Sequence, residues 1–143
     1  MSTPKHWQKI LIPTDFSDDA LKAIRQAMLL LQPGMELVLV HVTEPAFDGL
    51  RIHTGELHNA VQQAAQKQLE ELVEAHFPGH RAQVSTVVQE GRAGEIICGL
   101  AESLKVDAII IATHGITALK HFLLGSVAEK VVRHAPCSVL VAR

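Results

Sequence analysis

The sequence has few aromatic residues and few cysteines. Aromatic side chains make up 3% of the 143 residues, and there is one tryptophan and no tyrosine. The core must therefore be aliphatic, and the chain lacks the aromatic platform on which single-stranded nucleic acids stack. Cys98 and Cys137 both lie among apolar residues. We expect each to act as a small buried hydrophobic side chain and not as a disulfide or redox group.

An excess of charge of one sign and long apolar runs are also missing. The chain has 13 Lys and Arg residues against 15 Asp and Glu residues, for a formal net charge of −2. Such a balance does not attract nucleic acids or membranes through its field alone. No stretch reaches the ~20 apolar residues of a transmembrane helix, and residues 1–9 contain no signal-peptide core. We expect a cytoplasmic protein with no nucleic-acid or membrane partner.

Short apolar segments alternate with amphipathic ones along the chain. Strands are predicted at 10–12, 36–42, 82–88, 107–112 and 137–142, and helices at 20–31, 54–77, 94–104 and 126–134. Continuous apolar strands between helices indicate an α/β fold with an open parallel sheet covered on both faces. Right-handed crossovers with one reversal of winding predict the strand order 3-2-1-4-5 in a single domain, residues 1–143. The helix at 54–77 is expected to bury a stripe that includes Leu57, Val61, Leu69 and Val73.

The reversal of winding should bring two loops together beyond the carboxyl ends of strands one and four, where ligands bind in such folds. In the later loop, Gly125 and Ser126 precede a helix, whose N-terminus favours an anion. Ser126 and Glu129 also fit a capping box, so phosphate binding and simple capping both stay open. In the earlier loop, Asp15 could accept hydrogen bonds from a base or ribose, or Asp15 or Ser17 could cap the next helix.

Several segments taken together resemble the universal stress protein family over nearly the whole chain. They are residues 10–17, 40–42, 113–115, 123–131 and 135–141. The resemblance implies a flavodoxin-like, adenine-nucleotide alpha-hydrolase-like fold and a role in the stress response.

ATP-binding members of that family resemble one another in the motif Gly-x-x-Gly-(nine residues)-Gly-Ser/Thr. By position the motif falls on Ala112, Gly115, Gly125 and Ser126, so an alanine stands where the first glycine is expected. An alanine costs little there if its backbone is ordinary β, and weakens binding if a positive φ is needed. The resemblance implies ATP as the ligand, with or without Mg²⁺. It places the nucleotide-binding residues at Pro13, Thr14, Asp15, Val42, Ala112, His114, Gly115, Gly125, Ser126 and Val127.

Three other functional classes fit the residues less well. For an enzyme, Asp15 and His114 could act as base and partner, but the nearby carboxylates Asp18 and Asp19 are expected in the first turn of a helix. We therefore expect binding and not turnover. A phosphoacceptor receiver domain needs an Asp after strand three and a Lys after strand five, and the sequence has neither. The nine histidines are scattered, without the spacing of a metal site.

A dimeric interaction module that binds no ATP is the remaining alternative, and Ala112 favours it weakly. The last strand, Ser138–Ala142, would be an apolar edge, and such edges are normally covered or paired. We expect it to pair with its copy in a C2 homodimer. Residues 47–55 are interpreted as a flap beside the adenosine, with Arg51 and His53 as undecided ligand contacts.

Overall fold

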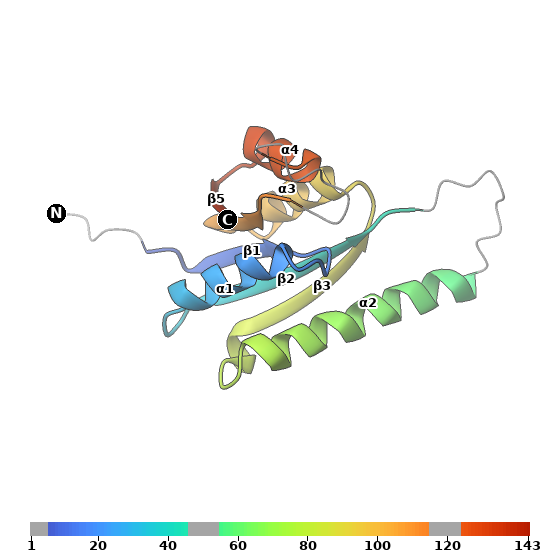
Figure 1. Cartoon of the computed structure of the whole chain (residues 1–143), viewed down its shortest axis with the longest axis horizontal. Helices are drawn as coiled ribbons and strands as arrows, with labels where there is room; N and C mark the ends of the chain where they lie inside the picture. The colour runs from blue at the N-terminus through green and yellow to red at the C-terminus, as the bar shows by residue number, and fades with distance from the viewer. Residues whose placement is uncertain (1–5, 46–54, 115–123) are drawn as a thin grey trace.

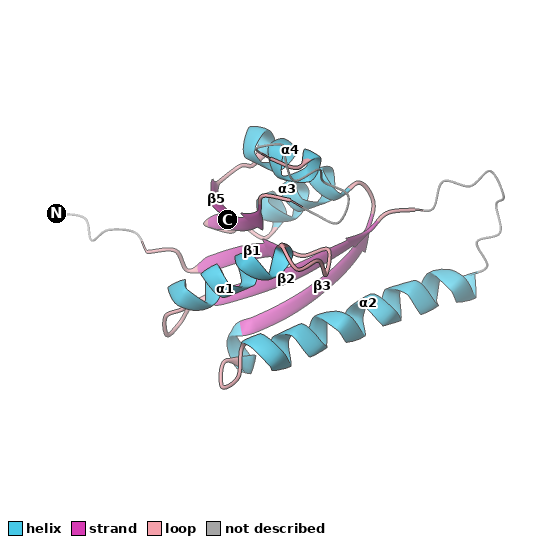
Figure 2. Cartoon of the chain, in the orientation of Figure 1, coloured by secondary structure: helices cyan, strands magenta, loops and turns pink. Residues whose placement is uncertain are grey.

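The computed structural model describes residues 6–45, 55–114 and 124–143. These residues form one sheet of five parallel strands with helices packed on both faces (Figures 1 and 2). The strands are β1 (Lys9–Pro13), β2 (Glu36–Thr43), β3 (Val84–Glu90), β4 (Ala108–Ala112) and β5 (Ser138–Ala142). Their order is β3-β2-β1-β4-β5. The predicted fold class and strand order are confirmed.

The helices divide into two layers. They are α1 (Ala20–Leu30), α2 (Gly55–His76), α3 (Ala93–Ser103) and α4 (Ser126–His134), with a 3-10 turn η1 at Arg81–Gln83. Ile10 and Ile12 of β1 pack with α1 and α2, whereas Leu11 between them packs with α3 and α4. Because successive side chains of a strand point to opposite faces, a strand covered on both sides must be apolar throughout. This explains the continuous apolar runs.

The sheet opens between β1 and β4. β1 stays in register with β2 along its whole length, and β4 with β5, but β1 and β4 share only the pairs Ile10–Ala108 and Leu11–Ile109. After β1 the chain turns toward β2, where the Thr14 N–H donates to the Val40 carbonyl at 2.8 Å. After β4 it follows β5, where the Thr113 N–H donates to the Ala142 carbonyl at 3.2 Å. The carboxyl ends of β1 and β4 therefore separate.

The prediction of a buried apolar stripe along α2 is wrong for the first turns of that helix. Leu69 and Val73 are fully buried, but Leu57 is 52% and Val61 46% exposed. The first turns of α2 lie at the carboxyl ends of β2 and β3, where His58 is 2.8 Å from Glu90 and Gln62 donates to Thr43 at 2.8 Å. Polar contacts, and not the burial of Leu57 and Val61, therefore join this part of the helix to the sheet. A regular apolar spacing predicts which residues share a face, but not how far the covering surface reaches.

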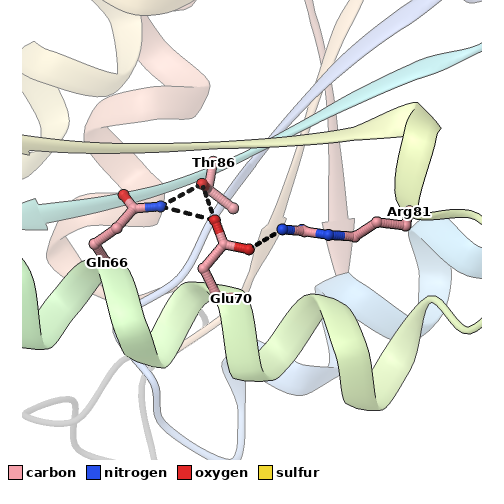
Figure 3. A network of polar contacts seen from close by, with 4 residues as sticks. All are labelled: Gln66, Glu70, Arg81 and Thr86. Atoms are coloured by element: carbon pink, nitrogen blue, oxygen red, sulfur yellow. Dashed lines mark hydrogen bonds and ion pairs between the residues drawn. The ribbon is translucent and has the colours of Figure 1, made fainter.

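A polar network fastens α2 to β3 (Figure 3). Gln66 donates to the Thr86 hydroxyl at 2.7 Å and to Glu70 at 2.9 Å, and Glu70 also pairs with Arg81. Arg81 lies in η1, which occupies residues that the sequence suggested as the start of the third strand. Burial acts to raise the pKa of Glu70, but Arg81 together with hydrogen bonds from Thr86 and Gln66 lowers it below its ordinary value.

Candidate functional site

A cavity of about 590 Å³ lies where β1 and β4 separate. The ends of the three central strands, the first turns of α3 and the start of α4 all contribute to its wall. Nine of the ten residues predicted from the sequence line it, namely Pro13, Thr14, Asp15, Val42, Ala112, His114, Gly125, Ser126 and Val127. The tenth, Gly115, lies outside the described residues, as do Arg51 and His53.

The turn after β1 is held by its own side chains. The Thr14 hydroxyl accepts the Phe16 N–H at 3.1 Å, and one oxygen of Asp15 accepts the Ser17 N–H at 3.0 Å as well as the Ser17 hydroxyl. Phe16 has a φ of 65°, which a side-chain-bearing residue adopts only when its neighbours stabilise it. The turn therefore presents Asp15 at the cavity wall in a defined position.

Asp19 is the N-cap residue of α1, and Ser17, two residues earlier, accepts a hydrogen bond from the first residue of the helix. The Ser17 hydroxyl accepts the Ala20 N–H at 3.2 Å, whereas Asp15 acts on the helix through Ser17. The expected placement of Asp18 and Asp19 inside the first helical turn is wrong, because α1 begins at Ala20. Asp19 precedes the helix and pairs with Lys22 at 3.0 Å. Asp15 therefore does not cap α1 itself, and the carboxylate of Asp15 lies at the cavity wall.

His41 supports the same turn from β2. Its Nδ1 lies 2.8 Å from the Thr14 carbonyl oxygen, and its ring centroid is 4.4 Å from that of Phe16. A carbonyl oxygen can only accept, so Nδ1 carries the proton in this contact. The sequence indicated His41 only as part of the strand-two segment, because its partners lie 25 or more positions away in the chain.

The start of α4 differs from a capping box. Gly125 is the N-cap, its carbonyl accepts the Glu129 N–H at 2.9 Å, and no side chain bonds to the cap. Ser126 is therefore the first helical residue, and its exposed side chain lines the cavity. Glu129 pairs with Arg133 at 3.0 Å. The first N–H groups of α4, which have no acceptor within the helix, lie at this wall.

Ala112 belongs to a regular strand. It ends β4 in register with Ala142 and is almost fully buried at the cavity wall. Among the described residues other than glycine, a positive φ occurs at Phe16 and Lys105. Ala112 therefore has an ordinary strand backbone, and its methyl group introduces no strain of the kind that a glycine would relieve.

Residues outside the family motif also line the cavity. Ala93 and Ile97 line it from α3, and Glu44 lines it from the end of β2. A Glu44 oxygen lies 3.5 Å from the Ala93 N–H, at the start of α3. The strand order could have indicated them, because every helix that follows a parallel strand begins near this edge of the sheet.

Two further features concern metals and membranes. Within residues 6–45, 55–114 and 124–143, no three His, Cys, Asp or Glu side chains gather closely enough to hold a metal ion. None of the helices in these ranges has the length and apolarity to cross a membrane.

Fold and site together define a doubly wound α/β domain with a ligand-sized cavity where the strand order reverses, faced by the N-termini of two helices. The family model described as the universal stress protein family matches residues 6–143. The chain therefore belongs to the universal stress protein family.

Individual proteins agree with this assignment. Universal stress protein MJ0531 of Methanocaldococcus jannaschii is 33% identical over 144 residues, covering 96% of this chain and 82% of the relative. The solved structure of the hypothetical protein MJ0577 has a TM-score of 0.84 at 30% identity, with 96% of each chain covered. A universal stress protein in complex with cAMP has a TM-score of 0.70 at 21% identity, covering 97% and 98% of the two chains, and shares the fold.

Proposed function

We propose that this stress-response protein binds an adenine nucleotide, ATP, in the cavity between β1 and β4, and acts by binding and not by turnover. The observation that carries the proposal is that Asp15, Val42 and Ser126 line one cavity although they come from three separate segments of the chain. A solved protein of the same fold is in complex with cAMP, which is also an adenine nucleotide.

The two ends of the cavity suit the two ends of a nucleotide. Asp15 and the Val42 backbone offer hydrogen-bond partners for the adenosine. The first turn of α4, at Ser126 and Val127, offers backbone N–H groups, a hydroxyl and the positive end of a helix dipole to the phosphates. Any accompanying Mg²⁺ would be held mainly through the phosphate oxygens, as is usual for this ion.

The hydrogen bonds and ion pairs of the carboxylates that line the cavity support binding without turnover. Asp15 accepts two hydrogen bonds from Ser17 within its own turn, and Glu129 pairs with Arg133 along α4. A general base needs its carboxylate oriented toward an attacking water. A third carboxylate at the cavity, Glu44, lies 3.5 Å from the Ala93 N–H at the start of α3. The hydrogen bonds and ion pairs described for these three groups hold the turn after β1 and the two helices.

Calorimetric titration of the whole chain with ATP, AMP, adenosine and GTP tests the proposal. We expect saturable binding of ATP, weaker binding of adenosine, and little binding of GTP. Absence of binding at millimolar ATP, with an unchanged circular dichroism spectrum, would overturn the proposal in favour of the interaction module. Steady phosphate release that disappears in Asp15→Ala would contradict the part that excludes turnover.

We also propose a homodimer formed through β5. β5 is an edge strand of the sheet, and Val139, Leu140 and Val141 are each partly exposed. An apolar edge with unpaired backbone groups favours pairing with another strand, and a C2 axis joins two copies of the same edge. A cytoplasmic location stays a prediction from the sequence.

A further inference from the structure

α3 and α4 pack closely together at Gly94. This glycine is buried, and a Cβ atom added to it would lie 2.7 Å from Cδ and 3.0 Å from Cγ of Lys130. Carbon atoms in van der Waals contact are about 3.5–4.0 Å apart. The stem of Lys130 therefore occupies the space that any other residue at position 94 would need. The Lys130 amine continues to Glu95, 3.3 Å from its carboxylate.

This contact lies directly behind the cavity wall. Ala93, the residue before Gly94, lines the cavity, and so does Ile97 one turn further along α3. On the other helix, Glu129 precedes Lys130 and also lines the cavity, as do Ser126 and Val127. Gly94 and Lys130 themselves do not line it. The pair thus joins two helices whose first turns both line the cavity.

We propose that Gly94 is a positioning residue that fixes the first turn of α4 at the distance required to bind the phosphate group of a nucleotide. The inference rests on the proposed function. A methyl group at position 94 displaces Cγ and Cδ of Lys130, and it also presses on the Lys130 Cβ, which is bonded to the α4 backbone and would lie 3.2 Å away. A helix moves as a rigid unit over one turn, so a shift of that Cβ also displaces the N–H groups at Ser126 and Val127. Hydrogen bonds from those groups depend steeply on distance and angle. The contacts proposed for adenosine, at Asp15 and Val42, come from the ends of β1 and β2 and do not involve α4.

The direct test is Gly94→Ala, titrated with ATP and with adenosine. We expect the affinity for ATP to fall about tenfold, equivalent to about 1.4 kcal/mol of binding free energy, while the affinity for adenosine stays that of the wild type. Gly99→Ala is the matched control. Gly99 lies in the same helix, and an added Cβ there meets nothing within 4 Å. Both variants gain helix propensity, so neither is expected to unfold.

A second variant separates crowding from other effects of the methyl group. Lys130→Ala removes Cγ and Cδ and leaves a Cβ that would lie 3.2 Å from the new methyl, a gap that a small shift can widen. We expect Lys130→Ala alone to lose less ATP affinity than Gly94→Ala, because it removes atoms from the contact without crowding it and the side chain does not line the cavity. The double variant Gly94→Ala/Lys130→Ala should regain most of the lost ATP affinity, which is the coupling expected of residues in contact.

The outcomes distinguish this inference from the proposed function. If the wild type binds ATP and Gly94→Ala binds it equally well, the positioning role is overturned and the nucleotide site stands. An equal loss of ATP and adenosine affinity, or no recovery in the double variant, also overturns it. If the wild type binds no nucleotide at all, the proposed function fails and this inference fails with it.

Discussion

Asp15 both stabilises its turn and faces the cavity, and the two roles can be separated. Asparagine keeps an oxygen that can accept the Ser17 N–H but removes the negative charge. We expect Asp15→Asn to stay folded and to lose about tenfold in ATP affinity, the loss of a charge-assisted hydrogen bond. Calorimetry on this variant and on Asp18→Asn, whose side chain is exposed outside the cavity, makes the comparison. Equal loss in both variants would contradict a specific role for Asp15.

The two cysteines are partly buried thiols on the α3 and α4 side of the sheet. Burial raises the pKa of both, and the neighbouring Cys98 and Asp107 raise that of Cys137 further. Since the thiolate is the reactive form, we expect both to react slowly with a thiol reagent at neutral pH in the native protein and fast in urea. A fast native phase assigned by Cys98→Ser and Cys137→Ser would contradict this.

At the scale of elements, the Glu70 network predicts how acid affects the attachment of α2 to β3. The folded protein holds the pKa of Glu70 below its ordinary value of 4.5, so the ionised form contributes stability at neutral pH. That contribution must shrink as the pH falls below 4.5 and through the lower folded pKa. Urea unfolding as a function of pH should therefore show a steeper acid decline in the wild type than in Glu70→Gln. Because Glu70 is about a third exposed, the effect is reduced by solvent screening.

α2 offers a matched pair of leucines for testing where the core ends. Leu69 is fully buried and Leu57 is about half exposed, and both lie on the same helix. We expect Leu69→Ala to lower the free energy of unfolding by about 2–5 kcal/mol, through lost burial and the cavity left behind. Leu57→Ala should change it by about 0.5 kcal/mol or less. Urea denaturation measures both, and a large loss at Leu57 would indicate that another surface covers the first turns of α2.

At the scale of the whole molecule, pairing of β5 with its copy should be visible in solution. Sedimentation is expected to give a dimer at micromolar concentration. Hydrogen exchange then identifies the interface, because backbone amides of Ser138–Ala142 that point away from β4 exchange fast in a monomer and slowly in a dimer. A monomer at micromolar concentration, or amides whose exchange does not change on dilution, would contradict the proposed interface.

The sequence predicted the order of the strands better than it predicted where individual helices begin and which of their residues are buried. Strand order could be predicted because it follows from apolar strands, helical spacing and the handedness of crossovers. Three local interpretations were wrong. Asp18 and Asp19 were expected in the first turn of a helix, yet α1 begins at Ala20. Ser126 and Glu129 have capping-box spacing, yet Gly125 is the N-cap and Glu129 pairs with Arg133. Leu57 has core spacing, yet its side chain is about half exposed. In each case the local spacing was correct, but the bounds of the folded helix or the burial of the side chain differed from what the spacing predicts.

The sequence by itself determined the doubly wound sheet and the loops that meet at its reversal, because these follow from patterns repeated within each segment. The tertiary structure decided the features that depend on contacts between segments far apart in the sequence. Ala112 lies in an ordinary strand, so its methyl group does not exclude a ligand by backbone strain. Gly94 lies against Lys130, 36 positions later in the chain, and this contact depends on how closely two helices approach. Such distances result from the packing of the entire domain, and only its folded form makes them visible.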